Sequence, residues 1–213
     1  MERENERALN EALKPYCDDC RRQLTIPEDA YNQYDVKRGL RNADGTGVLA
    51  GVTRICNVHG YVMEAHERRP AEGRLFYRGI DIRDLIEGCT AEDRFGFEEV
   101  VWLLLFGYLP TAEQLSGFTR LLEQHRELPE GFIEDMIIKA PSPNIMNKLA
   151  RSVLALYSYD ELAEDMSLEN IVRQSIELIA RVSTIMVNAY QVKKRYYDHQ
   201  SLFFHTPIDG MSF

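Results

Sequence analysis

The sequence has no long apolar run, and this absence excludes a helix that crosses a membrane. Its longest stretches without charge, Val100 to Ala112 and Val182 to Val192, fall short of the roughly 20 apolar residues that a bilayer requires. The N-terminal segment, Met1 to Asn10, is charged and lacks the apolar core of a secretory signal. We therefore predict a cytoplasmic protein with no membrane partner.

Basic charge is also in short supply. Lys and Arg number 25 against 34 Asp and Glu, which gives a net charge of -9. Because binding to nucleic acid requires a basic face, nucleic acid is excluded as a predicted partner. An anionic substrate would need a local cluster of Arg or Lys to overcome the repulsive net field.

The four cysteines are too few to form a disulfide scaffold and are typical of a reducing compartment. Cys17 and Cys20 form a C-x-x-C pair, but a structural zinc site needs two more ligands at similar spacing. Cys56 and His59 lie far away in an apparent strand. We therefore interpret the pair as two small residues in a helical N-terminal arm and predict no metal site.

Motifs that carry catalysis are missing as well. The five histidines show neither H-x-x-x-H nor H-E-x-x-H spacing, and there is no G-x-S-x-G elbow or G-x-x-x-x-G-K-[ST] phosphate loop. The segment Gly45 to Gly51 resembles a dinucleotide fingerprint only weakly, because an apparent strand follows it where a helix is required. The residues alone therefore predict no catalytic set and no cofactor.

The first part of the chain divides into two regions of different composition. Residues 1–37 are polar and rich in helix formers, which predicts an N-terminal arm with short helices. Glycines interrupt residues 38–79, and the β-branched and aromatic residues between them predict a small antiparallel β hairpin over about 47–79. We expect the polar segment Glu64 to Glu72 to form its loop.

From residue 80 onward the apolar residues recur at helical spacing. We expect helices over Ile80 to Glu87, stopped by Gly88, and over Phe97 to Tyr108, which is apolar all round and should be buried on every side. Thr111 and Gln114 predict a capping box for the next helix, and Pro129 predicts the start of a short one.

The last two helices that the sequence predicts are amphipathic. Ser142 and Pro143 are typical of an N-cap and first helical residue, which predicts a helix over 143–158. Ser167 predicts the cap of a second helix over 168–195, which at about 1.5 Å per residue would be about 40 Å long. Both carry apolar faces larger than monomers usually expose.

Six segments in order resemble the citrate synthase family. Lys37 to Tyr61 resembles the opening of these enzymes, Gly73 to Ile82 their L-x-Y-R-G-x-x-I stretch, and Phe97 to Pro110 their FEEV-x-x-LLL-x-G-x-LP pattern. The other three segments are Leu128-Pro129, Arg151 to Leu156 and Leu178 to Thr184. The similarity covers about residues 37 to 207. One departure is Ser183, where many members have proline.

The resemblance implies a mainly α fold: a citrate synthase-like helical large domain, incomplete here, with a small N-terminal antiparallel β hairpin. Residues 38–213 would form the N-terminal part of that domain, and the small domain would be absent. It also implies a homodimer through helices over about 143–158 and 168–195.

The implied reaction condenses acetyl-CoA, as substrate and not cofactor, with oxaloacetate. In the family an Asp and two His perform it by general acid–base catalysis. The H-A-[DE]-H motif that carries the first His does not occur here, so no catalytic residue is assigned and the chain is expected to be an inactive N-terminal fragment.

Arg41 resembles an Arg that reaches the CoA phosphates, although pairing with a nearby acid is an equal alternative. In the branch inhibited by NADH, basic residues lie near the last motif; only Arg181 matches, and Glu177 stands where another base is expected, so NADH control is not predicted.

Three interpretations stay open at this point. The first is citrate synthase, the second is 2-methylcitrate synthase with propionyl-CoA as acyl donor, and the third is a helical dimerisation module without activity.

Overall fold

The computed structural model describes residues 13–14, 16–17, 19–23, 26–27, 29–33, 52–64 and 67–204. The chain forms two compact units, one of residues 18–111 and the other of residues 1–17 with 112–213. The first holds a three-stranded antiparallel sheet and short helices, and the second is helical. The predicted fold class, mainly α with a small antiparallel hairpin, is confirmed.

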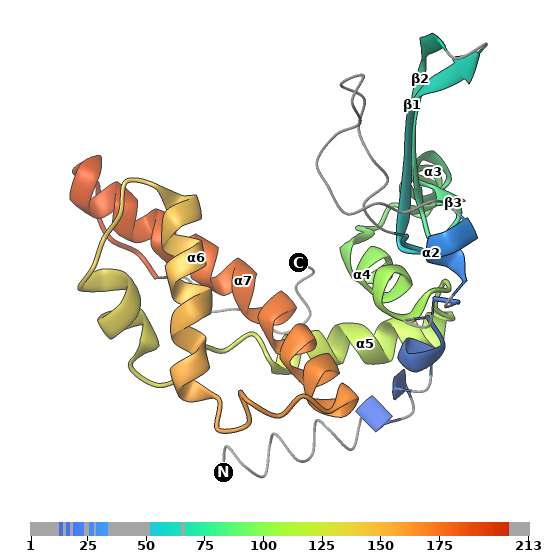
Figure 1. Ribbon diagram of the computed structural model, residues 1–213. Coiled ribbons are helices and arrows are strands. Elements are labelled where there is room, and N and C mark those ends of the chain that lie inside the picture. The colour runs from blue at the N-terminus through green and yellow to red at the C-terminus, as the bar shows by residue number, and fades with distance from the viewer. Residues whose placement is uncertain are drawn as a thin grey trace. The chain divides into compact units, whose positions relative to one another are not determined.

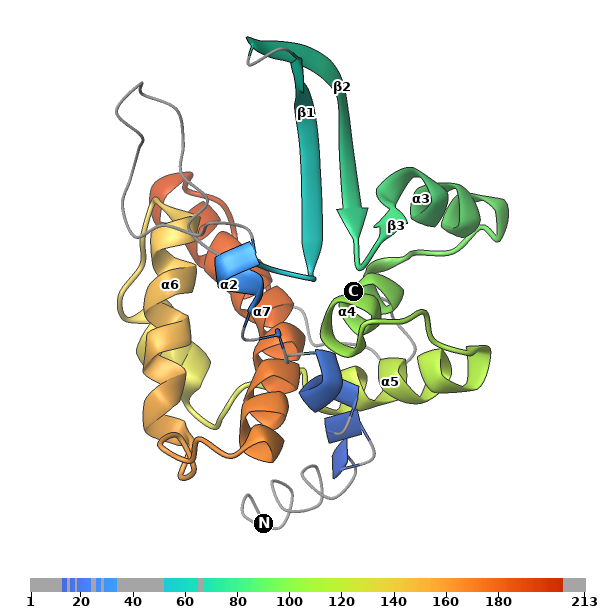
Figure 2. The ribbon, with the colours of Figure 1, turned by 45° about the vertical axis from the view of Figure 1, so that its right-hand side comes forward.

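The sheet of the first unit is a long two-stranded ribbon with one short addition (Figure 2). Strand β1 (Cys56–Glu64) pairs antiparallel with β2 (Glu67–Tyr77), and β2 pairs with the short β3 (Ile80–Asp81). The register shifts between His59 and Tyr61. The segment from Glu67 to Glu72 belongs to β2, so the prediction of a loop over Glu64 to Glu72 is wrong. The loop prediction failed because this part of the strand is polar and exposed on both faces.

The turn between β2 and β3 requires two left-handed residues. Arg78 has φ of 51° and Gly79 has φ of 88°, as in a two-residue hairpin turn. The Arg78 side chain then donates from Nε and Nη2 to the carbonyl oxygen of Leu104, at 3.1 and 2.7 Å. This contact ties the turn to the last part of helix α4.

Two helices follow in the same unit, α3 (Ile82–Ala91) and α4 (Phe97–Phe106). Asp81 caps α3, and Gly88 lies inside the helix, so the predicted stop at Gly88 is wrong. One glycine costs only about 1 kcal/mol in a helix, which packing outweighs. Helix α4 buries Trp102, Leu103 and Phe106, but Phe97 is 44% exposed, so the expectation of burial on every side is also wrong.

The helical unit consists of α5 (Ala112–Gln124), the π-helix Ile133–Ile138, α6 (Ile145–Leu156), a 3-10 turn (Tyr157–Tyr159) and the 30-residue α7 (Leu168–Tyr197). Helices α6 and α7 pack side by side (Figure 1). Six buried residues form their shared core with the π-helix: Phe132, Ile137, Leu156, Ile185, Ala189 and Val192.

The caps of α6 and α7 are set by side-chain oxygens. Ser167 Oγ accepts from the Asn170 backbone N–H at 3.3 Å, which confirms the predicted cap of α7. The predicted cap of α6 at Ser142 is wrong, because Asn144 Oδ1 accepts from the Asn147 N–H and the helix begins at Ile145. Ser142 Oγ accepts instead from the Asn144 N–H, in a turn just before the helix.

One lysine is part of the interior of this unit. Lys148 on α6 is buried, and its ammonium donates to the carbonyl oxygens of Met136 and Ala140, the latter at 2.9 Å. Burial lowers the pKa of Lys148, and the nearby Arg151 lowers it further. The lysine thus donates to one carbonyl in the last part of the π-helix and to one just after it.

Candidate functional site

The predicted substrate-binding residue, Arg41, lies outside the described residues, so its role stays a prediction. Among the residues that the structure describes, no group of three or more His, Cys, Asp or Glu side chains could hold a metal ion. Cys17 and Cys20 are both buried, and their thiols donate to the carbonyl oxygens of Leu13 and Leu105.

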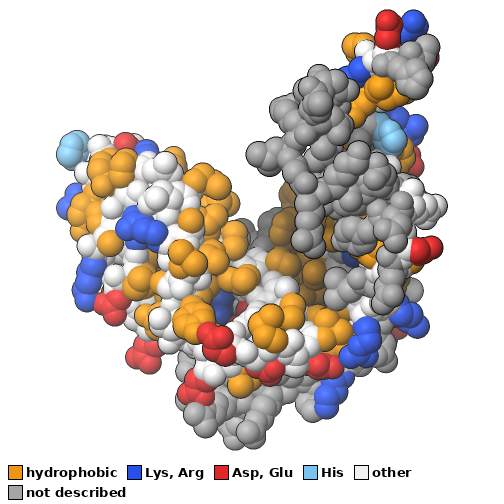
Figure 3. Space-filling model, viewed as in Figure 1, with side chains coloured by type: hydrophobic (Ala, Val, Ile, Leu, Met, Phe, Trp, Pro, Cys, Tyr) orange, Lys and Arg blue, Asp and Glu red, His pale blue; other side chains and the backbone are white. Residues whose placement is uncertain are grey.

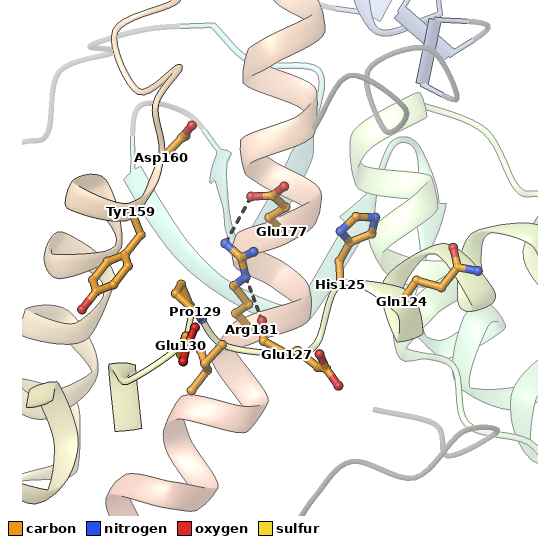
Figure 4. Close-up of a pocket in the computed structure, with 10 residues that line it drawn as sticks. Gln124, His125, Glu127, Pro129, Glu130, Tyr159, Asp160, Glu177 and Arg181 are labelled. Atoms are coloured by element: carbon orange, nitrogen blue, oxygen red, sulfur yellow. Dashed lines mark hydrogen bonds and ion pairs between the residues drawn. The ribbon is translucent and has the colours of Figure 1, made fainter. Parts of the chain in front are cut away.

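A polar pocket of about 230 Å³ lies in the helical unit (Figure 4). Its walls come from the end of α5 and the segment that follows, from the 3-10 turn after α6, and from α7. The lining residues are Gln124, His125, Glu127, Leu128, Pro129, Glu130, Tyr159, Asp160, Glu177 and Arg181.

A fully buried arginine organises one wall of this pocket. Arg173 on α7 donates from Nη2 to both carboxylate oxygens of Asp160 at 2.7 Å, from Nη1 to Glu177 Oε2 at 3.1 Å, and from Nε to Asn170 Oδ1 at 2.8 Å. Its side chain has no exposed surface. One nitrogen contacts both oxygens of Asp160, and hydrogen bonds between ionised groups of this kind are short and strong. The arginine therefore holds the segment after α6 against α7.

Asp160 is the main acceptor in this network. Burial raises the pKa of Asp160, but hydrogen bonds from Gln174, Arg173 and the Leu162 N–H outweigh burial, and the pKa lies below its usual value. The carboxyl group is therefore ionised at neutral pH and stays paired with the guanidinium.

Arg181, about two turns beyond Arg173 along α7, faces the pocket but is already engaged. Its Nη1 donates to Glu177 Oε2 at 3.2 Å, and its Nε donates to the carbonyl oxygen of Glu127 at 3.1 Å (Figure 4). Glu177 therefore bridges two guanidinium groups, Arg173 and Arg181.

His125 lies on the opposite wall and is half-buried. Burial lowers the pKa of His125; the charge of Glu177 opposes this effect, and the charges of Arg181 and Arg173 reinforce it. The imidazole is therefore neutral at pH 7, with one nitrogen able to donate and the other able to accept a hydrogen bond.

Chemically, this pocket offers an imidazole, a guanidinium and several carboxylates. The lining residues include no Ser, Thr, Cys or Lys that could act as a nucleophile. Four carboxylates line it, from Glu127, Glu130, Asp160 and Glu177, against one arginine whose charge Glu177 already balances. The local field therefore disfavours anions.

Sequence reasoning found part of this site and missed the rest. It singled out Arg181 and Glu177 but missed His125, Asp160 and Arg173. A signal was present, because Arg173, Glu177 and Arg181 alternate in sign at spacings of four, which places them on one face of a helix. No local pattern shows that Asp160 comes back to meet this face.

A second, mostly apolar groove of about 380 Å³ lies between α6 and α7. It shares Asp160, Glu177 and Arg181 with the polar pocket, and its apolar lining residues are Val153, Leu154, Leu156, Tyr157, Ala163 and Leu178. The charge network thus separates a polar cavity from an apolar groove.

Solved structures with the same arrangement of elements define the class of protein. Citrate synthase from Pyrobaculum aerophilum superposes with a TM-score of 0.56 and 25% identity, over 75% of this chain and 40% of that one. The fold is thus that of part of a citrate synthase. In the part of the chain that the structure describes, no helix is both long and apolar enough to span a bilayer.

Sequence relatives agree with the fold. The citrate synthase of Saccharolobus solfataricus is 27% identical over 75% of this chain and 36% of its own length. 2-Methylcitrate synthase 1 of Corynebacterium glutamicum is 31% identical over 75% of this chain and 36% of its own length. The family model described as citrate synthase, C-terminal domain, matches residues 40–209.

The chain belongs to the citrate synthase family, and the resemblance found in the sequence is confirmed. It spans about a third of the length of these curated relatives.

Proposed function

We propose that this chain is the N-terminal part of a citrate synthase, which condenses acetyl-CoA with oxaloacetate to citrate and CoA. The observation that carries the activity in this proposal is the match of one family model over residues 40–209. The N-terminal placement rests on the order of the six similar segments and on the missing H-A-[DE]-H motif. In the proposed reaction a carboxylate removes a proton from the thioester methyl group, and the resulting enol carbon attacks the ketone of oxaloacetate. Hydrolysis of the thioester then consumes one water and releases CoA.

The groups that move protons are proposed to come from outside these 213 residues. The sequence contains no H-A-[DE]-H motif, which in the family carries the first catalytic His. The chain would contribute scaffold, and Arg41 would contribute a cation for the CoA phosphates. By itself it is expected to be inactive.

A homodimer through α6 and α7 is the second element of the proposal. Both helices expose large apolar side chains: Met146 and Leu154 on α6, with Tyr157 just after it, and Ile171, Met186, Val187 and Tyr190 on α7. Hydrophobic surface is visible over this unit in Figure 3. Monomers rarely leave such surface exposed over long faces. The apolar groove between the helices would receive side chains of the second copy.

The acyl donor distinguishes two related activities. Relatives named citrate synthase and relatives named 2-methylcitrate synthase match to similar extents, so propionyl-CoA is the alternative donor. A cytoplasmic location and the exclusion of nucleic acid remain predictions from composition.

Thiol release provides the direct test. The 213-residue chain, mixed with oxaloacetate and either acetyl-CoA or propionyl-CoA, should release no CoA above background. The product of the reading frame extended beyond codon 213 should release CoA, and the preferred donor identifies the activity. Turnover by the short chain would show that the catalytic groups lie within it. An extended protein without turnover would favour a dimerisation module.

The dimer has its own test. Leu154→Glu places a charge on the exposed face of α6 and should shift the sedimenting species from dimer to monomer. Met166→Glu, at an equally exposed residue between the helices, is the matched control and should leave the dimer intact. Equal behaviour of the two variants would argue against this interface.

A further inference from the structure

Strand β1 is an edge strand of the sheet that the described residues form. The strand order is β1-β2-β3, so among the described residues β1 has a neighbour on one side only. All nine of its residues are exposed. The outward N–H and C=O groups of such an edge are available to pair with another strand, and a two-stranded ribbon is marginally stable in water.

The two strands of the ribbon differ in how they are protected against pairing. Strand β2 carries the features that block an edge, which are charges and a proline: Glu67, Arg68, Arg69, Pro70, Glu72 and Arg74. Strand β1 has His59 in its interior and Glu64 at its end, and no proline. Instead it exposes large apolar side chains: Val58, which is 72% exposed, Tyr61, Val62 and Met63.

The sequence of β1 is complementary to itself. Residues 56–64 have Gly60 at their centre, so a two-fold axis through Gly60 pairs residues whose numbers add up to 120. Val58 then lies opposite Val62 of the second copy, and His59 lies opposite Tyr61. Directly opposite β-branched and aromatic pairs stabilise an antiparallel ladder. The side chains of each pair project on the same face of the sheet.

Charge is complementary in the same register. Glu64 lies opposite Cys56 of the second copy and diagonally beside its Arg54. Arg54 is exposed and makes no ion pair with any described residue, whereas Glu64 pairs with its own Arg69 at 2.9 Å. Each end of the shared ladder would thus place one carboxylate between two guanidinium groups, with no like charges opposite one another.

Neighbouring registers are less favourable. A two-fold axis through His59 puts the two histidines opposite each other and leaves Val58 opposite a glycine. An axis through Tyr61 puts Val58 opposite Glu64. The pairing around Gly60 is therefore preferred by both apolar contact and charge.

We propose that the β1 edge is a docking surface for a second copy of this chain, with the two β1 strands paired antiparallel around Gly60 in a four-stranded sheet. Such an interface is isologous, because the same strand serves both partners. It involves neither α6 nor α7, so it is independent of the proposed function and of the helical dimer.

Cysteine crosslinking tests this pairing and its register. Opposite Cα atoms in an antiparallel ladder lie about 4.5–5.5 Å apart, which a disulfide can bridge. In a Cys56→Ser background, Gly60→Cys should give a covalent dimer under mild oxidation. The matched control is Gly73→Cys on β2, which, like Gly60, has open space around it. Because paired strands hold the thiols together, we expect crosslinking at least about ten-fold faster for Gly60→Cys.

Blocking the edge should abolish the crosslink. Val62→Lys, added to Gly60→Cys, should reduce the rate to that of the control, whereas Ala71→Lys adds the same charge on β2 and should leave the rate unchanged. Equal rates for Gly60→Cys and Gly73→Cys would overturn the proposal, as would equal blocking by the two lysines.

A second pair of variants keeps the test open if Gly60→Cys fails to fold. A mixture of His59→Cys and Tyr61→Cys chains should form the mixed dimer, because these residues lie opposite each other in the proposed register. Crosslinking of His59→Cys chains with themselves alone would overturn the register. None of these outcomes depends on condensing activity, so the function and the docking surface can fail separately.

Discussion

The α6–α7 pair and the β1–β2 ribbon place similar residues in opposite environments. Along α7, Arg173 has no exposed surface and pairs with two carboxylates, whereas Arg69 in the ribbon is 63% exposed and pairs with one. Ile185 is fully buried in the core of the helical unit, whereas Ile55, just before β1, is 43% exposed. The contrast shows that residue type alone does not determine how much a side chain contributes to the free energy of unfolding of this chain.

The physical reason for this contrast is the difference in solvent exposure between the two regions. A buried ion pair is weakly screened, and breaking it leaves a charge without compensation, so the loss is large. An exposed pair contributes only about 0–1 kcal/mol, because water and salt screen it. The helical unit should therefore respond strongly to single substitutions, and the ribbon should tolerate them.

The largest expected difference is at the arginines. Arg173→Met leaves Asp160 partly buried without a guanidinium partner and Glu177 paired with Arg181 alone, and we expect a loss of about 3–5 kcal/mol in the free energy of unfolding. Arg69→Met in the ribbon should change it by less than about 1 kcal/mol. Urea unfolding followed by circular dichroism at the helical band measures both. A similar loss for the two variants would remove the contrast.

The isoleucines give a smaller and better matched comparison. Ile185→Val removes one methylene from the core and should cost about 0.5–1.5 kcal/mol, whereas Ile55→Val should stay within about 0.5 kcal/mol. The same unfolding measurement applies. An effect at Ile55 as large as that at Ile185 would indicate that the base of the ribbon is covered by something else.

The smallest effect concerns pH. The pKa of His125 is lowered in the folded chain, so from that lowered pKa up to about 6.5, the unfolded value, the unfolded chain binds more protons. The free energy of unfolding should therefore fall on acidification through this range. His125→Gln should flatten this dependence, which urea unfolding at a series of pH values measures. A slope unchanged by His125→Gln would contradict the assigned environment.

Long periodic helices were predictable from the sequence. The apolar spacing of α7 and its cap at Ser167 are local features, and both were correct because cap and periodicity agree. The cap of α6 was misplaced by two residues, since Ser142 and Asn144 are both good caps and only the turn geometry decides between them. The polar arm of the ribbon was missed, because an exposed strand lacks the alternation that marks a half-buried one.

The polar pocket shows where local reasoning ends. Arg181 and Glu177 were visible through the family resemblance, but Asp160 meets Arg173 across 13 positions of sequence and a change of direction. Contacts of this kind are set by tertiary packing, which no local window contains. The charge network was therefore accessible only from the structure.

The buried ammonium of Lys148 has a consequence for chemical labelling. Because its donors are engaged by carbonyl oxygens inside the protein, acylating reagents and lysine-modifying enzymes can reach this amine only when the π-helix separates from α6. A chemical modification found on Lys148 would thus have been made before the chain folded, or while this part of the chain was open. Modification of Lys148 therefore reports whether this part of the chain was unfolded or open when the reagent was present.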